Sequence, residues 1–310
     1  MQLWKVDTLG GFMYSDQLSD VLRTALQPLT RFRNFCDIDE AKEKGTGEKH
    51  NWNVYSDVKE PGGELDEEQP MPESKFDINQ ETLTVTERGN SVPYTRKLDI
   101  LSKHSCETVI HKVLKNDARK TLDSAAHDEF DKTQLVVSPV DGTNDSEVVL
   151  DETGSAPETN DQAMTKEHVK AIADIMAERD IIPYDGEHYM CVARPTTFRN
   201  FKDDLESISF YIESGWGRIA AGEIGRYEGI RFFQQTNVKS EDWANDESDA
   251  AYFFGMDTVT EAIVEPEQIR AKLPGDYGRS RGIAWYYLGG FGISHTQADH
   301  SRIIKWGSAA

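Results

Sequence analysis

The sequence has few of the features that mark secreted or membrane proteins. Its three cysteines, Cys36, Cys106 and Cys191, are an odd number at wide spacing, which fits buried thiols in a reducing compartment better than a disulfide framework. No apolar run approaches the roughly 18 residues that a membrane-spanning helix needs. The opening residues MQLWKVD lack the basic region and apolar core of a secretory signal peptide. We therefore expect a chain with no membrane span and no leader.

Basic residues are also scarce. The 310 residues include 34 Lys and Arg against 55 Asp and Glu, a formal net charge of −21. This charge opposes general affinity for nucleic acids or anionic membranes, because a polyanion needs a basic binding surface. It also favours solubility.

The excess acid is concentrated in three stretches. Residues 37–81 carry a net charge of −9, residues 144–161 hold 6 acids and no base, and residues 241–249 hold 5 acids and no base. These stretches are predicted to be solvated loops. Only 37% of the chain is hydrophobic, although 10% is aromatic, which argues against disorder. The composition indicates a folded chain with long segments that do not contribute to its own core.

A long hairpin is predicted near the N-terminus. Residues 51–55 and 83–86 alternate in polarity as strands do, and about 25 residues rich in acid, Pro and Gly separate them. Such an arm cannot bury itself. Its partner is usually another chain.

A helix over residues 107–131 is the clearest predicted element. It would be about 37 Å long, it lacks sustained heptads, and it should pack against a sheet. Its apolar positions form one stripe: Val109, Ile110, Val113, Leu114, Ala118, Leu122, Ala125, Ala126 and Phe130.

The other predicted elements are segregated rather than alternating, which favours an α+β fold. Helices are predicted over residues 16–26, from 165 to about 176, and from 195 to about 205. A loop is predicted over residues 222–229. Strands are predicted at residues 134–137, 189–193, 230–233, 250–256, 282–288 and 303–306.

No motif for catalysis, cofactor or metal binding survives inspection. Residues 278–282 match G-x-S-x-G, but a loop precedes Ser280, a strand follows it, and only the adjacent Asp299 and His300 lie downstream to complete a triad. Residues 215–220 match G-x-G-x-x-A without the helix or acid of a dinucleotide site. Residues 141–152 resemble a calcium loop that lacks its glycine. We expect no enzyme, cofactor or metal site, and keep a serine hydrolase using Ser280 as a remote alternative.

Several segments, in order, resemble one protein family. Residues 82–95 (TLTVTERGNSVPYT), 118–123 (ARKTLD), 191–199 (CVARPTTFR), 222–232 (GEIGRYEGIRF) and 301–306 (SRIIKW) are similar to segments of the major capsid proteins of N-four-like podoviruses. These are tailed bacteriophages whose coat has the Hong Kong 97 phage fold. The likeness covers residues 80–306, and residues 1–80 match in layout only.

The resemblance implies a domain layout. Residues 1–45 become an N-terminal arm and 46–95 an extended E-loop. Residues 96–160 become a P-domain with its spine helix, 161–270 an A-domain, and 271–310 C-terminal strands that return to the P-domain.

The resemblance also implies a function and partners. The chain would assemble into pentamers and hexamers of an icosahedral virion capsid, built in the host bacterial cytoplasm, that encloses double-stranded DNA through non-specific contacts with a near-neutral inner surface. A separate scaffolding protein and a portal are the other expected partners, and a decoration protein is a further candidate. An encapsulin-like compartment is the main alternative.

The contacts between subunits are expected to involve the hairpin arm. It would lie over a neighbour's spine helix and bury Trp52, Val54, Tyr55 and Phe76 there. The acidic stretches would face outward or pair with bases such as Arg88, Arg96 and Lys97.

Overall fold

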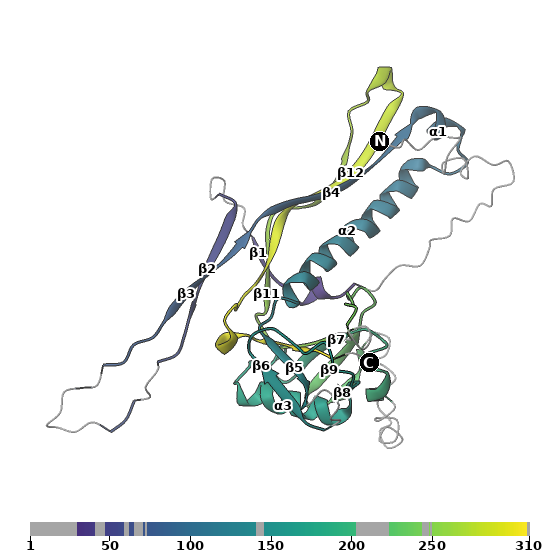
Figure 1. Cartoon of the computed structure of the whole chain (residues 1–310). Coiled ribbons are helices and arrows are strands. Elements are labelled where there is room, and N and C mark those ends of the chain that lie inside the picture. The colour runs from purple at the N-terminus through teal and green to yellow at the C-terminus, as the bar shows by residue number, and fades with distance from the viewer. Residues whose placement is uncertain are drawn as a thin grey trace.

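The computed structural model describes residues 30–40, 47–58, 62–64, 71, 73–140, 146–202, 223–243, 248 and 250–308. It confirms an α+β fold with three parts, which Figure 1 shows in one view: a thin hairpin arm, an elongated layer of helix and sheet, and a body at one end of that layer. The helix predicted over residues 16–26 lies outside the described residues.

The elongated layer consists of one long helix on a four-stranded sheet. The strands lie in the order β1 (Asp37–Glu40), β11 (Val259–Ala271), β12 (Ser280–Ile293), β4 (Thr86–Thr95). Strand β1 is parallel to β11, and the other pairs are antiparallel. Beyond β4, the short helix α1 (Arg96–Leu101) leads to the long helix α2 (Cys106–Phe130), which covers one face of the sheet.

The boundaries of α2 confirm the helix predicted from the apolar stripe. The Ser105 hydroxyl caps its first turn by accepting a hydrogen bond of 3.4 Å from the backbone N–H of Thr108. From Ile110 to Phe130 the stripe is buried, except that Val113 is exposed. The helix therefore buries a narrower face near its start than the stripe predicted.

The body is a seven-stranded sheet covered on both faces. Its strand order is β6 (Val148–Asp151), β5 (Leu135–Pro139), β13 (Ile303–Trp306), β10 (Ala251–Phe254), β7 (Tyr189–Ala193), β9 (Ile230–Gln234), β8 (Glu223–Tyr227). Alternate side chains such as Cys191 and Phe253 pack in one cluster with α3 (Lys166–Glu178). Their neighbours Val192 and Phe254 pack in a second cluster with the C-terminal end of α2. The elongated layer and the body thus share one core.

Three segments predicted to be loops contain strands that were not predicted. Residues 222–229 were predicted to be a loop, but β8 pairs antiparallel with β9 across a two-residue turn in which Glu228 and Gly229 have φ of 46° and 71°. Positive φ at both turn residues is the geometry of a tight hairpin, so Gly229 marks a turn rather than the end of a long loop. Strand β6 likewise lies inside the acidic stretch 144–161, and β1 lies inside the acidic stretch 37–81, where it pairs with β11.

The remaining expectations are met in part. All three cysteines are free and buried, as predicted. Residues 199–202 are helical, and the rest of the helix predicted to reach 205 lies outside the described residues. No helix within the described part of the chain is long and apolar enough to cross a membrane.

Candidate interaction surfaces

The hairpin arm is a two-stranded ribbon with two different faces. Strands β2 (Lys49–Tyr55) and β3 (Ile78–Thr84) pair antiparallel, with Tyr55 opposite Ile78 and Trp52 opposite Glu81. Because side chains alternate along a strand, His50, Trp52 and Val54 share one half-buried face. The opposite face is exposed and begins with polar residues such as Asn53 and Gln80.

The base of the arm is fastened to the end of β12 by close packing. The Trp52 indole N–H donates to the backbone carbonyl of Ser294 at 3.1 Å. A Cβ on Gly290 would lie 2.5 Å from the backbone oxygen of Thr84, and one on Gly292 would lie 3.1 Å from the Leu83 Cβ. The absence of these two side chains therefore allows the arm to approach the sheet this closely.

Polar contacts hold the same junction. The Nε2 of His50 lies 2.8 Å from an Asp39 carboxylate oxygen, and the Thr296 hydroxyl donates to Glu81 at 2.6 Å. The half of the arm nearest the sheet is thus fixed in direction by its own chain.

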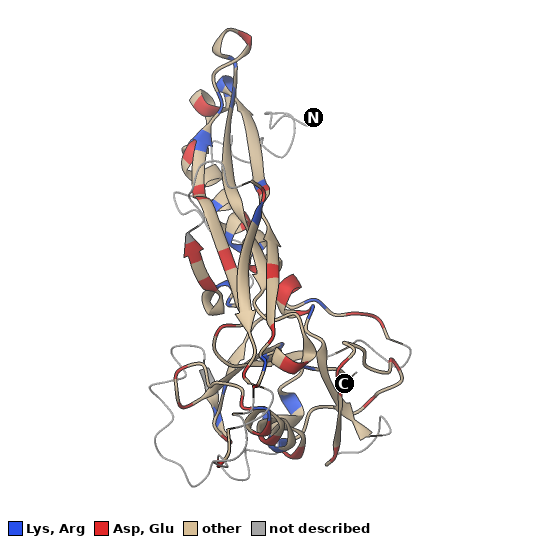
Figure 2. Cartoon of the chain, turned by 90° about the vertical axis from the view of Figure 1, so that its left-hand side faces the viewer, with Lys and Arg blue, Asp and Glu red and all other residues tan. Residues whose placement is uncertain are grey.

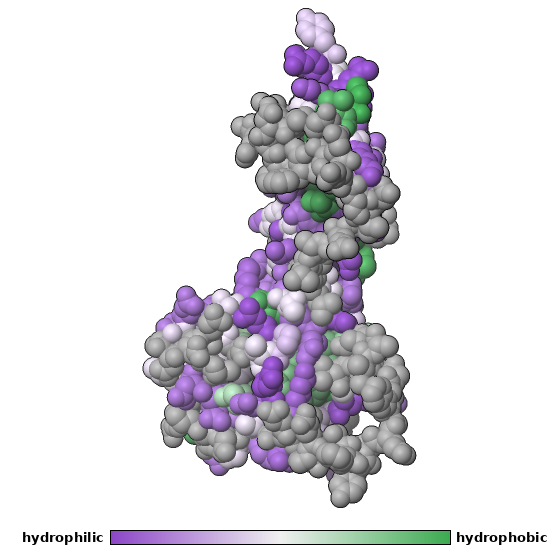
Figure 3. All heavy atoms as spheres, turned by 90° about the vertical axis from the view of Figure 1, so that its right-hand side faces the viewer, coloured by the Kyte–Doolittle hydropathy of each residue, from purple (hydrophilic) through white to green (hydrophobic). Residues whose placement is uncertain are grey.

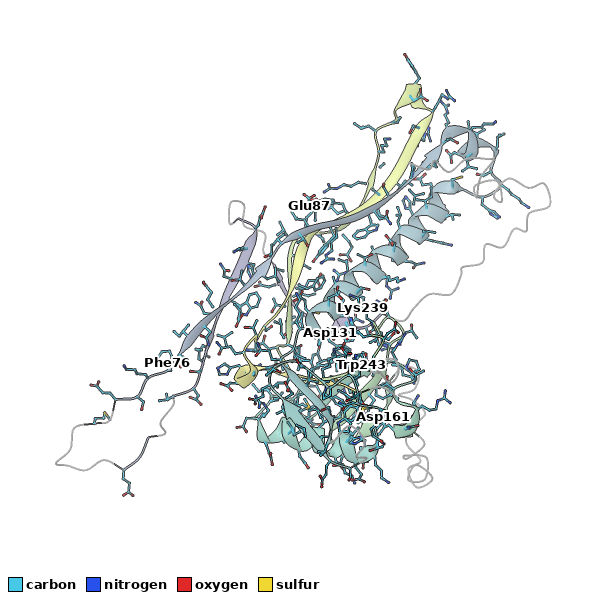
Figure 4. All side chains as sticks on the ribbon, in the orientation of Figure 1. Phe76, Glu87, Asp131, Asp161, Lys239 and Trp243 are labelled. Atoms are coloured by element: carbon cyan, nitrogen blue, oxygen red, sulfur yellow. The ribbon has the colours of Figure 1, made fainter. Side chains whose placement is uncertain are left out.

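The distal half of the arm carries exposed apolar side chains. The exposed fractions are 78% for Tyr55, 60% for Ile78, 56% for Phe76 and 72% for Met71. Tyr55 and Ile78 form a cross-strand pair on the exposed face. Phe76 lies on the arm far from the core of the molecule, as Figure 4 shows. These large apolar side chains stay exposed on a thin ribbon among the described residues, which makes this half a candidate interaction surface.

The residues predicted from sequence to lie between subunits fall into two groups. Tyr55, Phe76, Arg96 and Lys97 are exposed and available for contact. The other three are half-buried: Trp52, Val54 and Arg88. Of these, Trp52 already donates a hydrogen bond to its own chain. Sequence reasoning missed Ile78 and Met71, whose apolar side chains within a polar segment were the available signal.

The far end of the elongated layer is a second exposed tip. A short 3₁₀ turn, η4 (Asp276–Gly278), links β11 to β12, and Asp276 and Tyr277 have φ of 50° and 52°. This strained turn holds Tyr277 fully exposed. Arg279 follows this turn, and its backbone carbonyl accepts a hydrogen bond of 3.0 Å from the backbone N–H of Arg96. Four bases in the adjoining segments are exposed: Arg96, Lys97, Lys272 and Arg279. Figure 2 shows Lys and Arg in blue near this end.

A buried polar network connects the N-terminal segment to the sheet. Arg33, in the 3₁₀ turn η2 (Phe32–Phe35), donates from Nη2 to the carboxylate of Glu261 at 2.9 Å. The Tyr287 hydroxyl donates to the same carboxylate at 2.9 Å, and Arg33 also pairs with Glu267 at 3.0 Å. Burial and the neighbouring charge of Glu261 raise the pKa of Tyr287. Although burial alone would lower the pKa of Arg33, its hydrogen bonds to Glu267 and Glu261 raise it.

The geometry does not support the hydrolase alternative. Ser280 begins β12 at the exposed tip, and its backbone bonds to Gly275. Asp299 and His300 lie in the turn η5 (Ala298–His300) beside the body, at the other end of the molecule (Figure 1). The residues that a triad would need are therefore far apart. Among the described residues, no group of three or more His, Cys, Asp or Glu side chains could hold a metal ion.

Comparison with known proteins gives one consistent result at the level of fold. No protein-family model and no curated protein sequence matches the chain. Solved structures do match. The capsid of Ralstonia phage GP4 has a TM-score of 0.69 at 13% identity, covering 96% of this chain and 95% of its own. The capsid structure of cyanophage P-SCSP1u has a TM-score of 0.67 at 11% identity, covering 96% and 93%.

A third structure comes from another host. The head structure of Helicobacter pylori bacteriophage KHP40 matches with a TM-score of 0.65 at 9% identity, covering 95% of each chain. The similarity spans almost the whole chain in each case. The chain therefore has the Hong Kong 97 phage capsid fold.

Proposed function

We propose that this chain is the major capsid protein of a tailed bacteriophage, which assembles as pentamers and hexamers into an icosahedral shell around double-stranded DNA. The observation that carries the proposal is the capsid fold over nearly the full length, from the arm to the last strand. The exposed apolar half of the arm agrees with it, because a coat subunit completes its burial only on its neighbours.

We assign the parts as the sequence resemblance suggested. The N-terminal arm is residues 1–45, the E-loop 46–95, the P-domain 96–160, the A-domain 161–270 and the returning strands 271–310. The ordered likeness of five segments to N-four-like podovirus coats supports placing the chain in that family. Helix α2 is then the spine helix.

The distal arm is proposed as the main contact between subunits. It leaves the elongated layer on the side of the sheet opposite α2 (Figure 1). The arm would therefore lie on the sheet of a neighbouring subunit, and the spine helix of that neighbour would lie beneath the sheet. Each large apolar side chain buried in this way contributes about 1.5–3 kcal/mol. The acid of residues 37–81 would meet exposed bases such as Arg96 and Lys97 of the neighbour.

Further partners follow from this role. We propose that shells form in the host bacterial cytoplasm on a separate scaffolding protein, incorporate a portal, and become part of the virion. A decoration protein is a further candidate partner on the outer surface.

Electron microscopy tests the proposal directly. The purified protein, expressed with and without a candidate scaffolding protein, should form closed shells of uniform diameter, and shells from infected cells should contain DNA. Rings or tubes instead of shells would contradict it. Shells holding protein cargo and no DNA would indicate an encapsulin-like compartment.

A paired substitution tests the arm contact. Tyr55→Ser with Ile78→Ser should leave a folded subunit but abolish closed shells, because it removes the exposed cross-strand pair. The matched control is Asn53→Ser with Gln80→Ser, the next cross-strand pair on the same face. The control should assemble like the wild type. Equal assembly of both variants would refute the contact.

A further inference from the structure

The exposed side of α2 carries a row of four cations. Lys112, Lys115, Arg119 and Lys120 are all exposed, and none has an ion pair or hydrogen bond within the described parts of the chain. They lie within a segment of nine residues, whose first and last Cα atoms are about 12 Å apart along the helix axis. We call them the basic row.

The acids near the basic row are bonded elsewhere. Asp117 accepts hydrogen bonds from the Trp285 indole at 2.8 Å and from the Asn90 amide at 3.0 Å. Asp123 is buried and accepts from the backbone N–H of Arg33. Glu267, across a cavity of about 420 Å³ that Lys115 and Arg119 line, pairs with Arg33.

Both ends of the helix are closer to neutral. Glu107 lies 3.8 Å from His111, Glu129 pairs with Lys132, and Asp128 pairs with Lys239. Among the described residues, the positive charge of the basic row is therefore not cancelled by ion pairs, although the whole chain has a net charge of −21.

The basic row and the acidic arm lie on opposite sides of the subunit. Figure 1 shows α2 on one face of the sheet and the arm projecting from the other. If every subunit has the same face outward, one surface of the shell carries the arms and the other carries the rows. On the α2 side, the described surface is mostly hydrophilic with isolated apolar residues (Figure 3). Apolar side chains such as Val113 are a minority among the described residues of this surface, whereas the centre of an interface with a protein is usually apolar.

We propose that the basic row faces the interior of the shell and binds the phosphate backbone of the packaged DNA without sequence preference. This inference rests on the proposed capsid function. Interfaces with DNA are polar and positively charged, and duplex DNA carries a negative charge about every 1.7 Å of its axis, so several phosphates lie within reach of the row. The inner surface is then locally basic, rather than near-neutral as the sequence suggested.

Formaldehyde cross-linking of DNA-filled shells tests the contact. Nucleotide adducts mapped by mass spectrometry should occur at Lys112, Lys115 and Lys120. Lys75 on the arm and Lys272 at the exposed tip should carry at least tenfold fewer. Adducts mainly on the arm or the tip would overturn the inference. So would adducts between the row and a scaffolding protein with none to DNA.

Charge reversal supplies a matched comparison. Lys115→Glu with Arg119→Glu should still form closed shells, with adducts at Lys112 and Lys120 reduced severalfold. The control, Lys272→Glu with Arg279→Glu, reverses two charges at the tip and should leave those adducts unchanged. Unchanged adducts in the first variant would overturn the inference. If wild-type protein forms no closed shells at all, the proposed function itself has failed, which is a different result.

Discussion

At the scale of single residues, the carboxylate of Glu261 holds three chain segments together. It is fully buried and accepts hydrogen bonds from Arg33 of the N-terminal segment and Tyr287 of β12, while it belongs to β11. A buried charge that loses its partner is strongly destabilising, whereas an exposed pair contributes little. The two carboxylates that Arg33 contacts therefore differ greatly in importance.

Glu261→Ala should lower the free energy of unfolding by about 3–5 kcal/mol, because it leaves the Arg33 guanidinium and the Tyr287 hydroxyl without their buried partner. Chemical denaturation of the free subunit measures this loss. The control is Glu267→Ala, which removes the more exposed partner of Arg33 and should cost less than about 1 kcal/mol. Equal losses for the two variants would contradict the assignment.

A buried histidine makes stability depend on pH. His127 packs against the rings of Phe32 and Tyr252, with centroid distances of 4.8 Å and 5.1 Å. Neither of its ring nitrogens has a hydrogen-bond partner among the described residues. Burial lowers the pKa of His127 to about 4, although nearby Asp131 and Asp128 oppose the shift. The folded protein thus holds this imidazole neutral.

Stability should fall as the pH drops from about 6.5, the pKa of an unfolded histidine, toward about 4, because the unfolded chain takes up a proton that the folded one does not. The loss attributable to His127 is about 3 kcal/mol. In His127→Phe this part of the pH dependence should disappear, as measured by denaturation at a series of pH values. His111→Gln, at a half-exposed position, should keep the wild-type profile.

At the scale of elements, the arm separates a fixed base from a free end. The packing of Trp52 and Leu83 on β12 determines the direction of the arm, and the side chains beyond it are available to a neighbour. We therefore propose different roles for the two halves: the base contributes to the stability of the subunit, and the free end contributes to assembly.

Deleting residues 60–75 should give a soluble, folded subunit that forms no closed shells. The deletion removes much of the free end and leaves β2, β3 and the contacts of the base in place. Circular dichroism should resemble that of the wild type, while electron microscopy shows no shells. Normal shells from this variant would refute the role assigned to the arm.

The elements that could be predicted from sequence are those in which apolar residues recur at the regular spacing of a helix or a strand. The stripe of α2 and the alternation of β2 were readable because one face of each is buried. Strands β4 and β11 were missed because each contains a proline and many polar residues. Pro93 is tolerated since β4 is an edge strand, and Pro266 lies at an irregularity in the pairing of β11 with β12.

The interaction surfaces were predictable only in part. The exposure of Tyr55 and Phe76 could be predicted, because the hairpin is acidic and rich in Pro and Gly and so was not expected to pack on its own chain. The half-burial of Trp52 did not, because it depends on glycines in β12 that lie more than 200 residues away in the chain. The basic row could not be predicted from sequence for a similar reason. Asp117 and Asp123 lie close to it in the chain, and only the fold shows that their carboxylates bond to Trp285 and Arg33 instead.

At the scale of the whole molecule, the subunit has a well-packed core but also exposes large apolar side chains on its arm. The elongated layer and the body share a core, so the subunit should fold on its own. Its distal arm exposes apolar side chains that, on the proposed function, are covered by neighbouring subunits. Free and assembled subunits should therefore differ most at the arm.

Limited digestion with trypsin measures this difference. In free subunits, cleavage after Lys75 should be among the first events, because this exposed lysine lies in the distal arm. In closed shells, cleavage there should slow by at least about tenfold, since stable burial by a partner suppresses local opening. Cleavage after Lys272, at the exposed tip, gives a second site for comparison. Equal rates at Lys75 in both forms would contradict burial of the arm.

The contact between the arm and the sheet also has a consequence for inheritance. At Gly290 and Gly292 the close approach of the arm depends on the absence of a Cβ atom. A mutation to any other residue would therefore move the arm. The apolar side chains at the free end face no such restriction and can change together with the surface that receives them. On the proposed capsid function, we expect related chains to keep the two glycines while the exposed end of the arm diverges. Coats of diverged lineages should then resemble each other in outline yet fail to mix in one shell.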